Sequence, residues 1–433
     1  MIRPPPSETL KLWSKVAALS FGGPAAQISV MHRLVVEERK WVTEDQFLHA
    51  LNFCMLLPGP EAQQLATYLG WKLGGVRGGL TAGGLFILPG ILVIMALSLI
   101  YLAYGHTPMV AGAFFGLKAA VLAIVAQAVH GLARKALKTR LAWIAAAIAF
   151  AALFAFDIPF PIIILAAAAT GVAAHRGQNP DGHTDDHAPA PPLAATIRTA
   201  ATWLALWLGP VAGLWAVLGR DHILTQIAVF FATIAAITFG GAYSILAWVA
   251  QEAVMHFHWL SHGQMLDGLG LAETTPGPLI MVLQFIGFMA AAQQPGSLPP
   301  MLAGLLGGLT ATWVTFTPCF LWIFTGAPYM ERLRRLAPLT GALRLVTAAV
   351  VGVIFNLALW FGIHTLFHQT QHVRIMGGLA AFDWPIAASI EPAALGLTVL
   401  ALAMTLWLRL GMMWVLLTGV GGGLLLQLGG GLG

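Results

Sequence analysis

Glycine and proline stand in the middle of long apolar stretches of this sequence, where they expose backbone groups that could bind a ligand. FGGP at 21–24 returns as FGGA at 239–242, and PGP at 58–60 returns at 276–278. A proline inside a helix removes a hydrogen bond and clashes with the preceding turn, which costs about 3 kcal/mol. A helix that restarts after such a break presents free N–H groups and the positive end of its dipole. The four breaks therefore predict a site that binds an anion.

Basic side chains near the breaks are candidate partners for that anion, because arginine and lysine form charge-assisted hydrogen bonds with oxyanions. Arg33 follows the first broken segment and Arg77 follows the second, with Arg39, Lys40 and Lys72 as neighbours. The alternative is that these residues only mark the cytoplasmic side of a membrane.

Lys118 and Arg344 hold the same place in two similar segments, LKAAV and LRLVT. If the two segments run in opposite directions, one cation would guard each side of the binding site. Extension of each side chain to a lipid headgroup explains them equally well, since both lie near the start of a helix. The sequence leaves both interpretations open.

Two carboxylates lie beside the PGP motifs. Glu61 follows the first motif directly, and Glu273 precedes the second by three residues. A carboxyl group removed from water binds a proton more readily, so we expect one of the two to couple anion movement to protons. For Glu61 the alternative is a helix N-terminal cap, which the helix dipole favours.

Neutral donors complete the candidate site. Asn52, Gln63, Gln64 and Gln284 could donate to a ligand, or could satisfy backbone carbonyls that the breaks set free. The residues that we expect to bind the ligand are Phe21, Gly22, Gly23, Pro24, Gln27, Arg33, Pro58, Gly59, Pro60, Arg77, Lys118, Gly240, Gly241, Thr275, Pro276, Gly277, Pro278 and Arg344.

No enzymatic site, metal site or cofactor is predicted. His364, His368 and His372 fall four apart, on one helical face if a helix persists, but no carboxylate or cysteine joins them. The sequence contains no catalytic triad, phosphate loop or nucleotide fingerprint, and nothing indicates a nucleic-acid partner. Cys54 and Cys319 lie inside apolar runs, which is typical of small core residues rather than a disulfide.

Composition places these segments in a lipid bilayer. Of 433 residues, 58% are hydrophobic and 9% are charged, and the mean hydropathy is +0.81. Apolar runs of about 20 residues, enough to cross a bilayer, recur along the whole chain, so no sizeable soluble domain fits between them. The N-terminus shows no removable signal peptide.

The sequence contains a duplication. SFGG at 20–23 matches TFGG at 238–241, and LPGP at 57–60 matches TPGP at 275–278, both 218 residues apart. Trp41 and Trp259 share this offset, and GGLTA recurs further on at an offset of 229. Several matches in one register indicate two related halves, as in many transporter folds.

The apolar runs predict an all-α polytopic membrane protein with about 13 membrane segments. The predicted domains are an N-terminal repeat at 1–175, a polar linker at 176–198, an extra helix at 199–218 and a C-terminal repeat at 219–433. The segments are 9–38, 44–72, 78–104, 110–133, 141–156, 158–175, 199–218, 223–256, 262–290, 301–325, 340–363, 391–408 and 411–428.

An odd helix between two six-segment halves predicts that the halves are inverted relative to each other. The basic residues Arg134 to Arg140 mark one cytoplasmic loop, and Arg332 to Arg335 mark another. In the first half the second of these loops corresponds to GHTP at 105–108, which has no basic residue. Whether the broken segments cross the membrane or re-enter as hairpins stays open.

The residues resemble a known family. SFGGPAAQISVMHRLVVEERKWVTEDQF, LNFCMLLPGPEAQQLATYLGW and GGLTAGGLFILPG look like the N-terminal half of the long, two-domain chromate ion transporter family. TFGGAYSILAWVAQEAV and LAETTPGPLIMVLQFIGF resemble its C-terminal half. The resemblance implies oppositely oriented halves and efflux of chromate from the bacterial cytoplasm, with resistance as the result and sulfate as the closest analogue.

The expected function is therefore secondary active export of chromate across the bacterial inner membrane, driven by the proton gradient. Transport of sulfate or another oxyanion is the first alternative, because no residue separates tetrahedral dianions of similar size. A membrane enzyme or a scaffold subunit is the second, and the shortage of convergent histidines and carboxylates disfavours it. The expected partners are a small oxyanion and the lipid bilayer, and a homodimer is left open.

Overall fold

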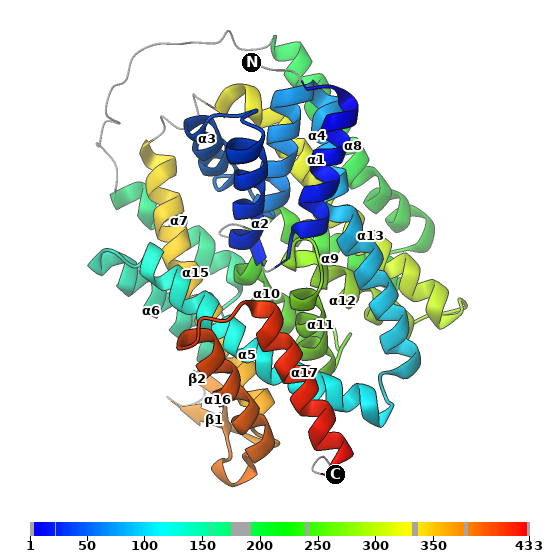
Figure 1. The fold of residues 1–433 in the computed structure, drawn as a ribbon, viewed down its shortest axis with the longest axis vertical. Helices are drawn as coiled ribbons and strands as arrows, with labels where there is room; N and C mark the ends of the chain where they lie inside the picture. The colour runs from blue at the N-terminus through cyan, green and yellow to red at the C-terminus, as the bar shows by residue number, and fades with distance from the viewer. Residues whose placement is uncertain are drawn as a thin grey trace. The chain divides into compact units, whose positions relative to one another are not determined.

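The computed structural model describes residues 4–21, 23–156, 158–174, 192–238, 242–330, 337–375 and 380–430. Helices dominate this part of the chain (Figure 1), and they follow the predicted apolar segments closely. The first half contains α1 (Pro6–Leu19), α2 (Gly23–His32), η1 (Arg33–Glu38), α3 (Glu44–Cys54), α4 (Glu61–Tyr104), α5 (Pro108–Ala136), α6 (Arg140–Phe154) and α7 (Phe160–Ala174).

The second half repeats this order after the unmatched helix α8 (Leu193–Leu218), which begins before the predicted residue 199. It contains α9 (Ile223–Ile237), α10 (Ala242–Gln251), η2 (Glu252–His256), α11 (His262–Thr274), η3 (Leu279–Met281), α12 (Val282–Gln293), α13 (Pro300–Gly326), η4 (Ala327–Tyr329), α15 (Ala337–Leu366), α16 (Pro392–Leu406) and α17 (Met412–Leu428). A short helical turn, η6 (Ala387–Ser389), precedes α16.

The predicted helical class is confirmed apart from one segment. The strands β1 (Thr370–Ile375) and β2 (Ala380–Pro385) form an antiparallel pair between α15 and α16. The first strand is largely polar and the second largely apolar, and pairing them as a two-stranded ladder satisfies backbone groups that no helix pairs.

The breaks fall where glycine and proline predict them. The α1 helix ends before Ser20, and the α3 and α4 helices are separated by residues 55–60, which include the PGP motif. The long element α4 is itself two helices, because Gly74 and Gly75 have non-helical angles (φ −138°, ψ 18° and φ 63°, ψ −156°). A turn at this point agrees with the predicted boundary between the segments 44–72 and 78–104.

The two halves share local details as well as element order. The π-helical turns η1 and η2 occupy matching positions. Lys40 and His258, 218 residues apart, both adopt a left-handed φ, of 53° and 52°. Thr43 forms a capping box with Gln46 at the start of α3, and the matching Ser261 exchanges the same two hydrogen bonds with Gln264 at the start of α11. The duplication seen in the sequence is therefore present in the backbone, whereas the opposite orientation of the halves and the count of thirteen spans stay predictions.

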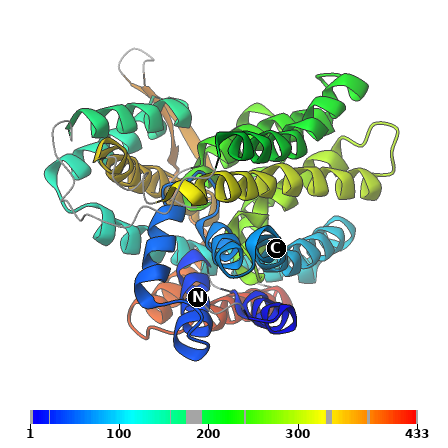
Figure 2. The same cartoon turned by 90° about the horizontal axis from the view of Figure 1, so that it is seen from above.

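The chain divides into two compact units, and each draws on both halves of the sequence. Unit 1 comprises Met1–Ser98, Val172–Ala242 and Thr275–Leu343, and unit 2 comprises Leu99–Gly171, Tyr243–Thr274 and Arg344–Gly433. In unit 1, α13 packs against α8, α9 and α12, and Figures 1 and 2 both show α8 alongside α13. In unit 2, α5 packs against α11, α16 and α17.

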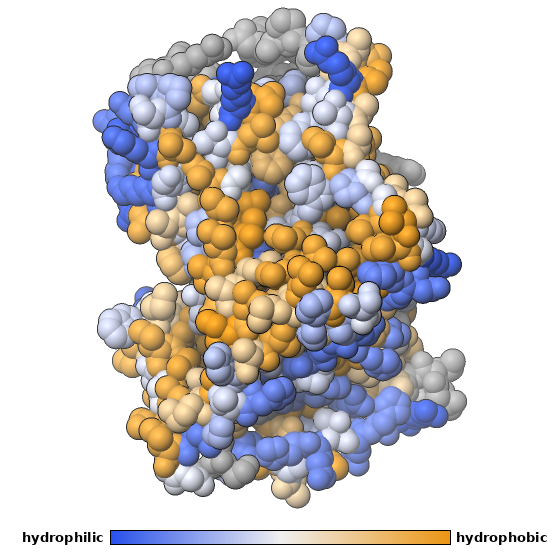
Figure 3. Space-filling view, turned by 90° about the vertical axis from the view of Figure 1, so that its right-hand side faces the viewer, coloured by the Kyte–Doolittle hydropathy of each residue, from blue (hydrophilic) through white to orange (hydrophobic). Residues whose placement is uncertain are grey.

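Several helices expose apolar side chains. In the described ranges, five helices are long and apolar enough to span a membrane. Along the second part of α4, Leu80, Leu88, Leu92 and Ile100 recur at helical spacing and are all at least 41% exposed. Apolar side chains also gather across the middle of the face drawn in Figure 3. Exposed apolar stripes of this kind are suited to lipid rather than to water.

Candidate functional site

The breaks of the two halves are joined by a reciprocal pair of backbone hydrogen bonds in unit 1. Gly59 N–H donates to the carbonyl of Thr238 at 2.7 Å, and Gly277 N–H donates to the carbonyl of Ser20 at 2.9 Å. Thr238 and Gly277 are the residues that match Ser20 and Gly59 in the duplication. Each PGP motif is therefore tied to the FGG motif of the other half. We call the described residues of these four segments (20, 21, 23, 24, 58–60, 238 and 275–278) the crossed break.

Glycine is required at the centre of each PGP motif. Gly59 has φ +121° and Gly277 has φ +101°, values that residues with a side chain rarely adopt. A Cβ on Gly59 would lie 2.9 Å from Gln64 Nε2 and 3.2 Å from Cys319 Sγ. A Cβ on Gly277 would lie 3.3 Å from Gly90 Cα, which is backbone of α4. Both the backbone conformation and the close neighbours therefore disfavour a side chain at these positions.

Buried polar side chains satisfy the carbonyls that the breaks set free. Gln27 Nε2 donates to the Gly277 carbonyl at 2.6 Å, and Gln64 Nε2 donates to the Pro58 carbonyl at 2.7 Å. Ser20 and Thr238 each donate to the carbonyl four residues earlier, both at 2.6 Å. These contacts hold the irregular backbone in place where no water is available.

We expect Gln27→Met to destabilise the protein by about 1–3 kcal/mol, because the substitution leaves the buried Gly277 carbonyl without its donor. The measurement is the thermal or denaturant midpoint of the purified protein. Thr81→Val is a matched control, since the Thr81 hydroxyl donates to a helix carbonyl at 2.9 Å on an exposed face. Equal midpoints for both variants would contradict the bracing role of Gln27.

The crossed break offers fewer free backbone N–H groups than its broken segments predicted. The N–H groups of Gly59 and Gly277 are used by the reciprocal hydrogen bonds and cannot serve a ligand. The first N–H groups of α4 have no acceptor within the helix, and Pro60, which precedes it, has no N–H. The first residue of α4, Glu61, is partly exposed.

Gln63 is the most unusual polar residue of this region. Its side chain is fully buried, yet neither its amide nitrogen nor its amide oxygen has a hydrogen-bond partner among the described residues. The amide oxygens of Gln27 and Gln64 are likewise buried without a partner in that part of the chain. A buried amide without a protein partner costs about 1–3 kcal/mol. Within the described part of the chain, Gln63 in the first turn of α4 is therefore a buried donor without an acceptor, next to a helix N-terminus.

The other predicted residues of unit 1 divide between the crossed break and the surface. Thr275 is buried at the crossed break, and Phe21 is partly exposed. Arg33 is exposed, with Nε 3.7 Å from an oxygen of Glu38, and Arg77 is also exposed. Gly22, Gly240 and Gly241 lie outside the described residues.

Unit 2 holds the remaining predicted charges. Glu273 is buried near the end of α11, whereas Arg344 is exposed on α15. Lys118 on α5 lies 3.0 Å from Asp267 Oδ1 on α11, and the Tyr101 hydroxyl donates to Asp267 Oδ2 at 2.7 Å. Sequence reasoning missed Asp267, although an acidic residue inside an apolar helix was a sufficient signal.

The three histidines at 364–372 do not share a helical face. The α15 helix ends at Leu366, so His364 lies on a helix and His372 on β1. Carboxylates do join them, contrary to the sequence analysis, because His368 lies 2.6 Å from Glu391 and His372 lies 3.1 Å from Asp383. Among the described residues, no group of three or more histidine, cysteine or acidic side chains could hold a metal.

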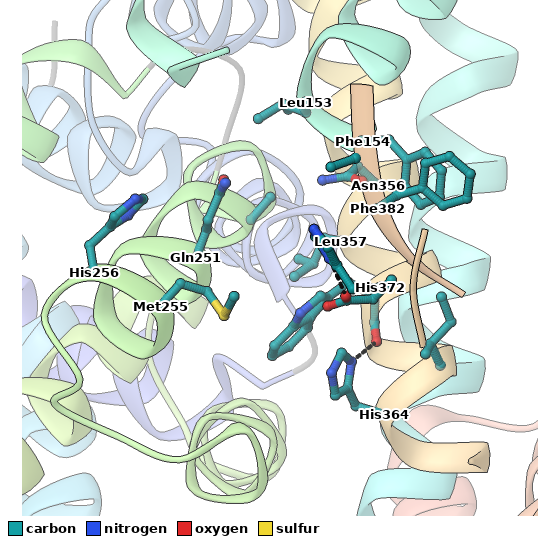
Figure 4. Close-up of a pocket in the computed structure, with 15 residues that line it drawn as sticks. Leu153, Phe154, Gln251, Met255, His256, Asn356, Leu357, His364, His372 and Phe382 are labelled. Atoms are coloured by element: carbon teal, nitrogen blue, oxygen red, sulfur yellow. Dashed lines mark hydrogen bonds and ion pairs between the residues drawn. The ribbon is translucent and has the colours of Figure 1, made fainter. Parts of the chain in front are cut away.

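A cavity of about 380 Å³ opens beside these histidines in unit 2. Figure 4 shows Gln251, Met255 and His256 on one side and Asn356, Leu357 and His364 of α15 on the other. His364 Nδ1 lies 2.9 Å from the Trp360 carbonyl, which fixes the orientation of the ring. The cavity is lined by aromatic, histidine and carboxylate side chains. It therefore lacks the uniform positive charge of an anion site.

Comparisons with known proteins agree with the duplicated architecture. The family model described as "Chromate transporter" matches residues 7–172 and 225–424, one segment in each half. A chromate transport protein of Cupriavidus metallidurans is 30% identical over 347 residues, covering 78% of each chain. A chromate transport protein of Pseudomonas aeruginosa is 34% identical over 362 residues, covering 81% of this chain and 80% of the relative.

A shorter relative matches only part of the sequence. An uncharacterized transporter of Bacillus subtilis, YwrB, is 31% identical over 124 residues, which is 29% of this chain and 63% of the relative. No solved structure matches this chain. The two-part family match and the long alignments to the bacterial relatives lead to one conclusion: this chain is a multi-pass membrane protein that belongs to the chromate transporter family.

Proposed function

We propose that this protein exports chromate from the cytoplasm, that it binds the dianion at the crossed break, and that its activity gives resistance to chromate. The observation that carries the proposal is the reciprocal pair of hydrogen bonds between Gly59 and Thr238 and between Gly277 and Ser20. It keeps two interrupted segments unwound a few residues before Gln63, whose buried amide has no partner among the described residues. In a membrane, irregular backbone of this kind is tolerated only inside the protein or beside a water-filled path.

The duplication supports alternating access to this site. Gly59 of the first half contacts Thr238 of the second, and the matching Gly277 of the second half contacts Ser20 of the first. Such exchanged contacts are those of a two-fold relation. Inverted repeats related by an axis in the membrane plane place their substrate site at the repeat interface, where broken helices meet. Matching loops with opposite basic character agree with such an axis.

The direction of transport follows from the charge of the substrate. An inside-negative potential is worth about 2.3 kcal/mol per charge per 100 mV. At 100 mV the free energy of a dianion therefore falls by about 4.6 kcal/mol when it leaves the cell. The electrical part of the proton gradient is therefore enough to favour export. Glu61 at the start of α4 and Glu273 near the end of α11 are the proposed sites where protons enter the cycle.

The test is chromate uptake into everted membrane vesicles containing the protein. With a lumen-positive potential set by valinomycin and potassium, we expect accumulation of chromate well above vesicles without the protein. A lumen-acid pH gradient at fixed potential should change the rate, and Glu61→Gln combined with Glu273→Gln should remove that change. No uptake above protein-free vesicles under any gradient would overturn the proposal.

Sulfate uptake in the same vesicles tests whether the protein transports sulfate rather than chromate. Amide and helix N-terminal donors bind any tetrahedral dianion of similar size. Chromate uptake that excess sulfate fails to reduce identifies a chromate-selective exporter, and sulfate uptake faster than chromate uptake identifies a sulfate transporter.

A further inference from the structure

A reciprocal pair of side-chain hydrogen bonds joins α8 to α13 in unit 1. Trp207 Nε1 of α8 donates to the Val314 carbonyl of α13 at 2.9 Å. Trp313 Nε1 of α13 donates to the Leu206 carbonyl of α8, also at 2.9 Å. Each indole therefore bonds the residue next to the other indole, which ties the two helices together at this point.

Both accepting carbonyls are ones that a proline has set free. Pro210 lies inside α8 and Pro318 lies inside α13. Each proline stands four residues after an acceptor, Leu206 or Val314, and it has no N–H to give to that carbonyl. In a lipid environment the carbonyl needs another donor. The two indoles supply it, so each tryptophan stabilises the proline site of the other helix.

The proline site of α13 lies against the crossed break. Cys319, the residue after Pro318, is fully buried, and its Sγ would lie 3.2 Å from a Cβ on Gly59. The duplication repeats this packing. Gly90 matches Cys319 at the offset of 229, and a Cβ on Gly90 would lie 2.9 Å from the Pro276 carbonyl oxygen. The segment after the proline of each long helix therefore packs on the PGP motif of the other half.

Aromatic rings continue the contact between α8 and this segment of α13. Trp203 stacks on Phe320 with ring centroids 5.4 Å apart, and Trp207 meets Trp322 edge-on at 6.3 Å. On its other side Phe320 packs on α4, because its Cε1 would lie 2.8 Å from a Cβ on Gly83. Among the described elements α8 has no counterpart in the duplication, so this brace acts on the second half alone.

We propose that Trp207 is a positioning residue for the crossed break. By holding the Val314 carbonyl it fixes the course of α13 at Pro318 and keeps Cys319 packed on Gly59, while Trp207 itself does not touch the oxyanion. Trp313 braces α8, a helix that contributes no residue to the crossed break. The inference rests on the proposed function, because it takes the crossed break as the oxyanion site.

The first test is equilibrium binding of radiolabelled sulfate to the purified full-length protein. Trp207→Phe keeps an aromatic ring and removes the N–H, so we expect the dissociation constant for sulfate to rise by about tenfold. Trp313→Phe removes the matching hydrogen bond at Pro210 and should leave the dissociation constant unchanged. Equal weakening by the two variants, or weakening by neither, would overturn the inference.

The second test follows Cys319 directly and needs no oxyanion. In a Cys54→Ala background Cys319 is the one thiol of the chain. Trp207→Phe should raise the rate at which N-ethylmaleimide labels this thiol by about tenfold, because the segment opens more often once the Val314 carbonyl loses its donor. Trp313→Phe should be labelled at the rate of the background protein. Equal labelling rates for the two variants would contradict a specific role of Trp207.

A restored backbone donor separates positioning from stability. Pro318→Ala combined with Trp207→Phe returns an N–H to the Val314 carbonyl, so the thermal midpoint should rise above that of Trp207→Phe alone. Sulfate binding should stay weak, because the helix continues through the place where the proline set its course. Parent-like binding by the combined variant would assign Trp207 to stability alone.

The two tests also distinguish this inference from the proposed function. If labelling of Cys319 follows the expected pattern while the parent protein neither binds nor transports any oxyanion, the proposed function fails and Trp207 still positions Cys319. If the parent protein binds and transports chromate while Trp207→Phe and Trp313→Phe behave alike in both tests, only the positioning role fails.

Discussion

Substitution of Gly59 by alanine is expected to lower chromate transport by about 10- to 100-fold, because backbone strain of about 1–3 kcal/mol is added at the centre of the site. The φ of +121° is one that alanine rarely adopts, and its Cβ would lie 2.9 Å from the Gln64 amide that braces the Pro58 carbonyl. Relief of the strain must shift the backbone at Gly59 or the Gln64 side chain that donates to the Pro58 carbonyl. We expect Gly277→Ala to act in the same way, because its neighbour is the backbone of Gly90.

Two glycines of α4 provide controls for this result. Gly84→Ala adds a Cβ in a helix where nothing lies within 4 Å, so transport and stability should stay close to those of the parent. Gly75→Ala places alanine at φ +63° with no steric neighbour, which strains a turn outside the crossed break. The measurement is the initial rate of chromate uptake, normalised to the amount of folded protein. Parent-like transport by Gly59→Ala would show that the break is not part of the transport path.

The breaks could be read from the sequence because glycine and proline act locally. A proline lacks an N–H whatever its neighbours, so two prolines around a glycine at 58–60 strongly disfavour a continuous helix. Single prolines are tolerated, since Pro89 and Pro318 stand inside helices. The apolar runs likewise predict the helices, since their length is set by the bilayer. Repetition of both signals at one offset predicted the shared architecture of the two halves.

The contacts across the breaks could not be predicted, because they join residues distant in the chain. Nothing near Gly59 in the sequence indicates that its N–H donates to the carbonyl of Thr238. This contact uses a backbone donor that the break had been predicted to offer to a ligand. The ion pair of Lys118 with Asp267 likewise joins residues that are far apart in the chain. Long-range pairing depends on how the two halves pack, which local patterns do not encode.

The β-hairpin was missed for a different reason. Gly377 and Gly378 stand between two segments that alternate in polarity, which is a hairpin signal. The expectation that helices fill a membrane protein outweighed that signal. The same assumption extended the helix of His364 to His372, whereas α15 ends at Leu366.

Replacement of Gln63 by leucine is expected to separate stability from function. The buried amide of Gln63 has no partner among the described residues, so its removal relieves a cost of about 1–3 kcal/mol and should leave the thermal midpoint unchanged or higher. Loss of a buried donor from an oxyanion site should weaken sulfate and chromate binding by about tenfold or more. A residue that only fills space would leave binding per folded molecule unchanged, because leucine and glutamine have similar volumes.

Gln284→Leu is the matched control for this prediction. The Gln284 amide donates to the Ile91 carbonyl at 2.9 Å, and its oxygen accepts from the Thr312 hydroxyl at 3.0 Å. Its replacement should therefore lower the thermal midpoint, because the Ile91 carbonyl loses this donor and the Thr312 hydroxyl keeps only the Gly308 carbonyl as acceptor. Any loss of binding should follow the loss of folded protein. Gln63→Glu sharpens the contrast, since it keeps the shape but places a negative charge beside the dianion and should abolish binding. Opposite stability changes at Gln63 and Gln284, with weaker binding per folded molecule only at Gln63, are the pattern that a substrate donor requires. Weaker binding by Gln63→Leu that is fully explained by unfolding would instead assign Gln63 to the packing of α4.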